Sequence, residues 1–261
     1  MNTRQALPLL QSTLLLLAAC GGGGSGGSGP DQAIGGAWVG FDAIGGEVFA
    51  LSTESGQLHW VLPATGEQGF GSGTVNGKKV TFNYTYVAPL GFTLDDGSTY
   101  ASCTAKGTIR ERQSITANTS CVTGRGGSFD NSVTLTYDPL YEVSSSLTTV
   151  AGDYDDFGQV VSVGSDGSIF QQDANTGCTM NGQVSIVDPQ YNVYRVSFSY
   201  ANCQGAYAPV NGSRFSGLAL YDNTMATHWI IFGVTGVVDG VTYSLVSSMP
   251  KMPAVSRSSR L

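Results

Sequence analysis

The feature that most limits how this chain can fold is a two-residue turn signal that recurs between segments of alternating polarity. Asn-Gly and Asp-Gly pairs accept the positive φ angles of tight hairpin turns at little cost. They occur at Asn76-Gly77, Asp96-Gly97, Asp166-Gly167, Asn181-Gly182, Asn211-Gly212 and Asp239-Gly240. Turns this short join antiparallel neighbours, so the sequence predicts an all-β protein.

The segments between these turns have the two-residue period of half-buried strands. In the run from Lys79 to Tyr86, Val80, Phe82, Tyr84 and Tyr86 fall on one face, because successive side chains of a strand point to opposite sides. Further runs are rich in β-branched and aromatic residues: 133–137, 159–163, 193–200, 215–221, 229–234 and 241–246. About fourteen strands are expected from this pattern. With 36 glycines and only 12% charged residues, the composition is typical of exported β-proteins with many turns.

The first nineteen residues have the pattern of a cleavable export signal. Arg4 is the only charged side chain, Leu14–Leu17 form an apolar run, and two alanines precede Cys20. Polar residues and a proline interrupt the apolar stretch before it reaches the roughly 20 residues of a transmembrane helix. We therefore expect residues 1–19 to be a signal peptide.

The string Leu17-Ala18-Ala19-Cys20 resembles the lipobox of bacterial lipoproteins. The resemblance implies that Cys20 is lipidated, through fatty acids such as palmitate, and that the preceding peptide is removed. Glycine and serine dominate residues 21–30, so residues 20–35 are interpreted as the lipidated cysteine and a flexible tether. The resemblance implies a membrane partner through Cys20 at the cell envelope, in the outer membrane because glycine follows the cysteine. An ordinary signal peptide cleaved elsewhere is the alternative.

Two halves of the remaining chain look like copies. Cys103–Ile109 parallels Cys178–Val184, and the order of flanking motifs is preserved. We expect two similar antiparallel β-barrel or sandwich-like lobes from an internal duplication, at residues 36–148 and 149–249, followed by a flexible tail at 250–261. One continuous β-fold is the alternative.

The four cysteines after Cys20 form one pair in each proposed copy. In an oxidising compartment this favours the pairings Cys103 with Cys121 and Cys178 with Cys203 among three possible connectivities. Each bridge would stabilise its lobe by about 3 kcal/mol. A zinc site is disfavoured because no Cys-x-x-Cys spacing or nearby histidine accompanies them.

No convincing catalytic constellation is present, and neither a cofactor nor a metal is expected. His59 and His228 each precede a tryptophan, which favours a buried indole and a solvent-facing imidazole. The acidic cluster of Asp153, Asp155 and Asp156 is interpreted as a solvated turn rather than a calcium site. The glycine-rich stretches 66–73 and 124–127 are interpreted as loops, because neither is followed by a helix that could bind phosphate.

Three function classes are compatible with these features. The preferred one is a non-enzymatic envelope lipoprotein that presents a binding face to a protein or glycan. The others are a β-barrel carrier of a small apolar ligand and a hydrolase with an unrecognised site. The layout is similar to that of two-lobed β-barrel lipoproteins that bind host or envelope proteins, but no binding residue can be carried over. The net charge of −7 and the scattered basic residues argue against nucleic acid as a partner.

Overall fold

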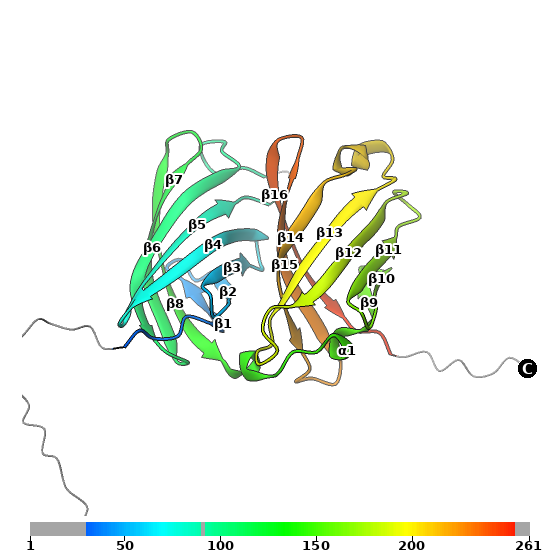
Figure 1. The fold of residues 1–261 in the computed structure, drawn as a ribbon. Helices are drawn as coiled ribbons and strands as arrows, with labels where there is room; N and C mark the ends of the chain where they lie inside the picture. Colours follow the sequence, from blue (N-terminus) through cyan, green and yellow to red (C-terminus); the bar gives the residue numbers. More distant parts are fainter. Residues whose placement is uncertain (1–29, 90–91, 254–261) are drawn as a thin grey trace, which may run out of the picture.

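The structure is a computed structural model that describes residues 30–89 and 92–253. In this part of the chain, sixteen strands form two antiparallel lobes that lie side by side (Figure 1). The predicted all-β class with two similar lobes is confirmed, and the strand number exceeds the expected fourteen by two. None of the helices in the described ranges has the length and apolarity needed to span a bilayer.

The first lobe is a closed barrel of eight strands in sequence order. The strands are β1 (Gly36–Asp42), β2 (Glu47–Ser52), β3 (Gln57–Leu62), β4 (Glu67–Asn76), β5 (Lys79–Val87), β6 (Tyr100–Arg110), β7 (Ser114–Thr123) and β8 (Ser128–Asp138). Closure comes from antiparallel pairing of β1 with β8, from Ala37 opposite Asp138 to Asp42 opposite Val133. The predicted inward face of β5 is confirmed, because Val80 and Phe82 are buried in the barrel core.

The second lobe is an eight-stranded sheet with the same up-and-down order. Its strands are β9 (Gly152–Asp156), β10 (Gln159–Val163), β11 (Ser168–Gln172), β12 (Thr179–Ile186), β13 (Tyr194–Ala201), β14 (Arg214–Asp222), β15 (Trp229–Val238) and β16 (Val241–Pro250). Its first and last strands approach each other through an isolated antiparallel bridge between Tyr154 and Lys251. A 3-10 helix, η2 (Gly205–Val210), precedes β14.

A short connector joins the lobes and contains the 3-10 helix η1 (Pro139–Glu142) and one helical turn, α1 (Leu147–Val150). Asp138 caps η1 by accepting a hydrogen bond from the Leu140 amide at 2.9 Å. Proline at the first helical position is compatible with this cap, because it lacks the N–H that would be unpaired there.

Some glycines predicted to lie in turns or loops are inside strands instead. Asn76-Gly77 and Asp239-Gly240 do join strands, but Asn181-Gly182 lies within β12 and much of 66–73 lies within β4. Glycine occupies these positions because a larger side chain would not fit, and not because a turn requires it. A Cβ on Gly182, for example, would lie 2.6 Å from the Phe198 Cβ. Glycine in a strand here marks the close approach of an aromatic neighbour.

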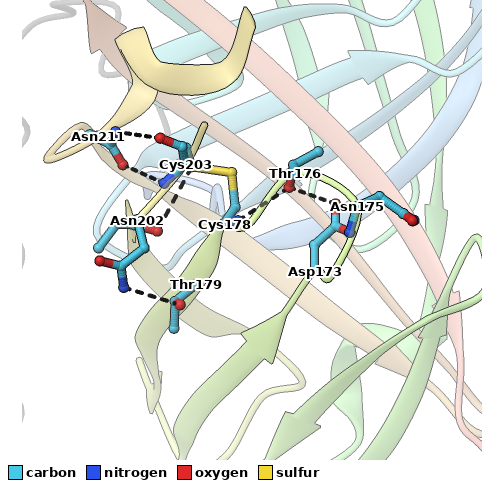
Figure 2. Close-up of a disulfide and its surroundings, with 9 residues drawn as sticks. Asp173, Asn175, Thr176, Cys178, Thr179, Asn202, Cys203 and Asn211 are labelled. Atoms are coloured by element: carbon cyan, nitrogen blue, oxygen red, sulfur yellow. Dashed lines mark hydrogen bonds between the residues drawn. A yellow bond between two sulfur atoms is a disulfide. The ribbon is translucent and has the colours of Figure 1, made fainter. Parts of the chain in front are cut away.

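The predicted cysteine pairs are both disulfides, Cys103–Cys121 and Cys178–Cys203. They do not occupy equivalent strands. Cys103 and Cys121 are direct cross-strand partners on β6 and β7, whereas Cys178 precedes β12 and Cys203 follows β13 (Figure 2). The Asn211 side chain holds the second bridge by accepting from the Cys203 amide at 2.8 Å and donating to its carbonyl at 3.0 Å.

The outer faces of the two lobes pack against each other. Their shared apolar cluster contains Leu51 from β2, Tyr141 from η1, and Leu218 and Leu220 from β14. A polar contact across this junction is made by Arg195 of β13, which donates to the Gln57 side chain at 3.0 Å.

His59 lies in this junction, which corrects the expectation that its imidazole faces solvent. It is buried with neighbouring Gln68, and neither side chain has a hydrogen-bond partner. Both side chains face glycines of the second lobe: a Cβ on Gly217 would lie 2.7 Å from His59, and one on Gly233 would lie 3.0 Å from Gln68. The imidazole does point away from the barrel interior, as alternation requires, but the second lobe covers it.

Candidate functional site: a cavity inside the first barrel

The interior of the first barrel contains a cavity of about 620 Å³. This volume lies within the range of roughly 300–1,000 Å³ that small-molecule sites occupy. Its lining extends from Trp38, Leu135 and Ile115 in the barrel core to the loops at one end, among them the β1–β2 turn and the β7–β8 turn. We call this end of the barrel the mouth.

The cavity exists because several inward positions carry small side chains. Ala50, Ala105 and Ala117 line it from β2, β6 and β7. An eight-stranded barrel is just wide enough for ordinary side chains to fill, so alanines at these positions leave space unfilled. On β4, a Cβ on Gly69 would lie 2.0 Å from the Trp60 indole nitrogen, so the missing side chain provides the room in which this indole lies.

Aromatic side chains from β3, β5 and β8 also line the cavity. Trp60 of β3 makes an edge contact with Tyr84 at 5.6 Å between ring centroids and lies 5.5 Å from Tyr86, both on β5. Tyr86 in turn contacts Phe129 of β8 at 5.7 Å. These four rings form a continuous chain of aromatic faces and edges, which we call the aromatic wall.

Most polar groups of the cavity lie near the mouth. Deeper in, the Tyr84 hydroxyl donates to Thr119 at 3.3 Å. At the mouth, Asp42 is buried and its carboxylate accepts from the amides of Ile44 at 3.1 Å and Gly46 at 2.6 Å. Burial raises the pKa of Tyr86, and the neighbouring carboxylates of Glu67 and Asp42 raise it further. Its phenol is therefore a neutral hydrogen-bond donor at physiological pH.

The opposite end of the barrel is closed by the chain segment that enters the first strand. This segment, residues 31–35, is tied to the turns of that end: the Asp31 carboxylate accepts from the Gly77 amide at 2.6 Å, and Glu111 accepts from the Ala33 amide at 3.0 Å. Ile34 packs into the barrel core with Val80 and Ile109. The cavity is therefore a cup with one open end.

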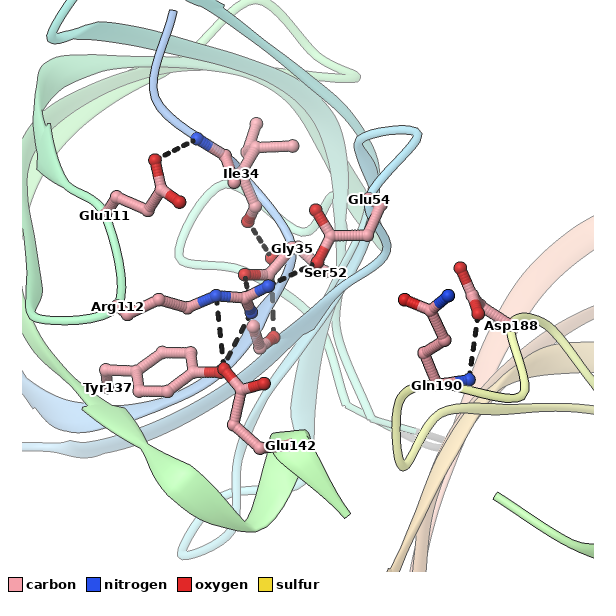
Figure 3. Close-up of polar contacts among 12 residues, drawn as sticks. Ile34, Gly35, Ser52, Glu54, Glu111, Arg112, Tyr137, Glu142, Asp188 and Gln190 are labelled. Carbon is pink, nitrogen blue, oxygen red and sulfur yellow. Dashed lines mark hydrogen bonds and ion pairs between the residues drawn. The ribbon is translucent and has the colours of Figure 1, made fainter. Parts of the chain in front are cut away.

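Arg112 connects this closed end to the rest of the molecule, and no sequence pattern pointed to this residue. Its guanidinium donates to the Gly35 carbonyl at 3.0 Å and forms ion pairs with Glu54 at 2.8 Å and Glu142 at 3.2 Å (Figure 3). It also lies within 5.3 Å of the ring centroids of Tyr137, Tyr141 and Tyr191. Because Tyr191 belongs to the second lobe, the side chain links both lobes and the connector.

The other candidate residues from the sequence lie away from this cavity. His228 is exposed, with its Nδ1 2.9 Å from the Tyr221 hydroxyl. Asp153, Asp155 and Asp156 are on strand β9 rather than in the expected turn, because they pair with β10. Across the described ranges, no three His, Cys, Asp or Glu side chains gather closely enough to hold a metal ion. Cys20, the predicted lipidation site, lies outside the described residues.

Comparisons with protein-family models and with curated protein sequences found no match to this chain.

Proposed function

We propose that the first barrel binds a small, predominantly apolar molecule inside its cavity, without chemical conversion. The observation that carries this proposal is the aromatic-walled cavity of about 620 Å³, closed at one end and open at the other. A soluble protein loses stabilising contacts around an unfilled interior, and a ligand that occupies the space restores them. The cavity thus favours a ligand carrier over the protein- or glycan-binding face preferred from the sequence.

A cavity-filling variant tests this proposal. Ala117 on β7 is buried and lines the cavity, so Ala117→Trp is expected to occupy much of the space and abolish binding of the neutral fluorophore N-phenyl-1-naphthylamine. Val122 on the same strand is 56% exposed on the outside, so Val122→Trp is the matched control and should leave binding intact. Equal binding by both variants would place the fluorophore elsewhere and refute the proposal.

A search for a natural ligand complements the variants. Solvent extraction of the protein purified from its native membrane, followed by mass spectrometry, is expected to release a small molecule that Ala117→Trp does not retain. Release of the same molecules from both proteins would mark them as bound to the surface or to the detergent.

We further propose that this carrier works as a lipoprotein anchored in the outer membrane through Cys20, which the lipobox-like string and the glycine-serine stretch support. Intact mass of the membrane-extracted protein should show the loss of residues 1–19 and added acyl mass. The Cys20→Ser variant should lose both maturation and sedimentation with the envelope. Unchanged maturation and sedimentation would contradict the anchor and leave the binding proposal standing.

A further inference from the structure

The mouth of the cavity carries a one-sided set of charges. Six of the residues that line the cavity are acidic, and among its described lining residues none is lysine, arginine or histidine. The six are Asp42, Glu47, Glu67, Asp95, Asp96 and Asp130. They lie at the mouth ends of β1, β2, β4 and β8 and in the loop between β5 and β6, so negative charge surrounds the described opening of the aromatic interior.

The overall acidity of the chain does not account for this asymmetry. At the closed end of the same barrel, acidic and basic side chains are mixed: Arg112 pairs with Glu54 and Glu142, and Lys78 and Lys79 lie in and beside the β4–β5 turn. At the mouth end, Arg125 lies in the β7–β8 turn and donates to the Asp96 carbonyl at 3.1 Å from an exposed position. The two ends of one barrel therefore differ in charge balance.

Some of these carboxylates also serve the turns that carry them. Asp42 binds two amides of its own turn, and Asp96 binds Thr123 and the Ser98 amide. Glu47 has no hydrogen bond to its side chain among those described, and it is exposed. Glu67 accepts from the Thr65 hydroxyl at 2.9 Å. The carboxylates of Glu47 and Glu67 can therefore accept further hydrogen bonds without disturbing the turns.

The aromatic wall also favours a positively charged group deeper in the cavity than the mouth. Ring faces attract cations, and the attraction grows when water is excluded. Tyr86, which lies beside the Glu67 carboxylate, joins Trp60 on one side and Phe129 on the other. A cationic group entering the mouth would meet carboxylates first and aromatic rings next, while an apolar tail would occupy the space beside the alanines.

We propose that the ligand of the first barrel is an apolar amine or quaternary ammonium compound, whose hydrocarbon part fills the cavity and whose cationic group lies at the mouth between the carboxylates and the aromatic wall. This inference rests on the proposed binding function and specifies its ligand class. A fatty acid, which has a similar tail, would bring its carboxylate against six others.

Matched head groups on one hydrocarbon tail test the charge preference directly. N-phenyl-1-naphthylamine is bound to residues 30–261, a segment that contains both described lobes, both cores and both disulfides. It is then displaced by dodecyltrimethylammonium, 1-dodecanol or dodecanoate, each below its aggregation threshold. At low salt the cation is expected to displace the fluorophore at a concentration about 10-fold below the alcohol, and dodecanoate to be the weakest competitor.

Variants assign the preference to the mouth. The double variant Glu47→Gln/Glu67→Gln is expected to reduce the preference for the cation over the alcohol to about 3-fold. Glu111→Gln, which removes one carboxylate at the closed end, is the charge control and should keep the full preference. Raising ionic strength to about 0.5 M should weaken the preference, since exposed charges are screened over a few ångströms there.

The outcomes separate the two proposals. If the fluorophore binds and the three head groups compete equally, or if the double variant keeps the full preference, the cationic ligand is refuted and the binding function stands. If the fluorophore fails to bind a preparation that unfolds cooperatively, the binding function itself is refuted. Thermal unfolding of each variant, monitored by circular dichroism, verifies that lost binding is not lost folding.

Discussion

The two lobes have the same number of strands in the same order, yet one is hollow and closed while the other is filled and joined at its edges by a single bridge. In the second lobe, large side chains meet at the centre: Phe198 lies 5.7 Å from Phe215 and 6.4 Å from Phe232. In the first, alanines of β2, β6 and β7 line the cavity. The same up-and-down strand order therefore accommodates both a hollow closed barrel and a sheet with a packed aromatic core, which is why function must be argued from the site and not from the fold.

Replacing one buried phenylalanine in each lobe should give the largest difference in unfolding free energy between the two lobes. Phe198→Ala removes a ring that is surrounded on all sides and should cost about 4 kcal/mol of unfolding free energy. Phe82→Ala removes an equally buried ring that borders the existing cavity, so it should cost about 2 kcal/mol and change ligand affinity as well. Denaturant unfolding measures both costs. Equal losses would mean that the first barrel is not hollow in solution.

Removal of the two disulfides should have similar effects on stability but different effects on ligand binding. The bridges close loops of 18 and 25 residues, so replacing either pair by alanines should cost a similar amount, about 3 kcal/mol. Only Cys103–Cys121 packs beside Tyr84, Tyr86 and Phe129, so only its loss should also weaken fluorophore binding. A matching loss of binding on removing Cys178–Cys203 would contradict this assignment.

Lowering the pH should reduce the unfolding free energy of the protein, because His59 is buried between the lobes as a neutral imidazole. Burial lowers its pKa from 6.5 to about 4, so the unfolded chain binds the proton more readily than the folded one. The stabilisation from the neutral imidazole is complete above pH 6.5 and is lost as pH falls toward 4, by about 2 kcal/mol at pH 5. Unfolding measured from pH 7.5 to 4.5 should show this slope in the native protein and lack it in His59→Gln.

His228 provides the matched control, because it is exposed whereas His59 is buried. The His228→Gln variant should keep the acid-dependent loss of stability. If His59→Gln retains the same slope as the native protein, another group is responsible for it, and the junction is not the acid-sensitive part of the molecule.

The smallest expected effect is at Arg112, where the two lobes and the connector meet. Arg112→Lys keeps the charge but loses the planar group that contacts three tyrosine rings and two glutamates. We expect a loss of about 1 kcal/mol in unfolding free energy, with no change in fluorophore affinity because the cavity opens at the other end. A change in affinity without a change in stability would contradict a purely structural role.

The sequence predicted features whose causes are local. The alternation along Lys79–Tyr86 fixed which residues of β5 face inward, and the cysteine spacing predicted both bridges. It could not predict that His59 is buried, because the glycines that accommodate it lie in the other lobe. Nor could it predict the cavity, whose volume depends on the summed side chains of eight strands, or the contacts of Arg112, whose three ring partners come from β8, η1 and the second lobe.

Residues 31–35 place the attachment of the chain at the closed end of the barrel. A flexible tether from Cys20 would therefore join the barrel at the end opposite the mouth and leave the opening free of the attachment. Cargo could then be exchanged with the surrounding fluid. A spectroscopic label placed on Glu47 should accordingly be reached by water-soluble quenchers and shielded from quenchers dissolved in the lipid.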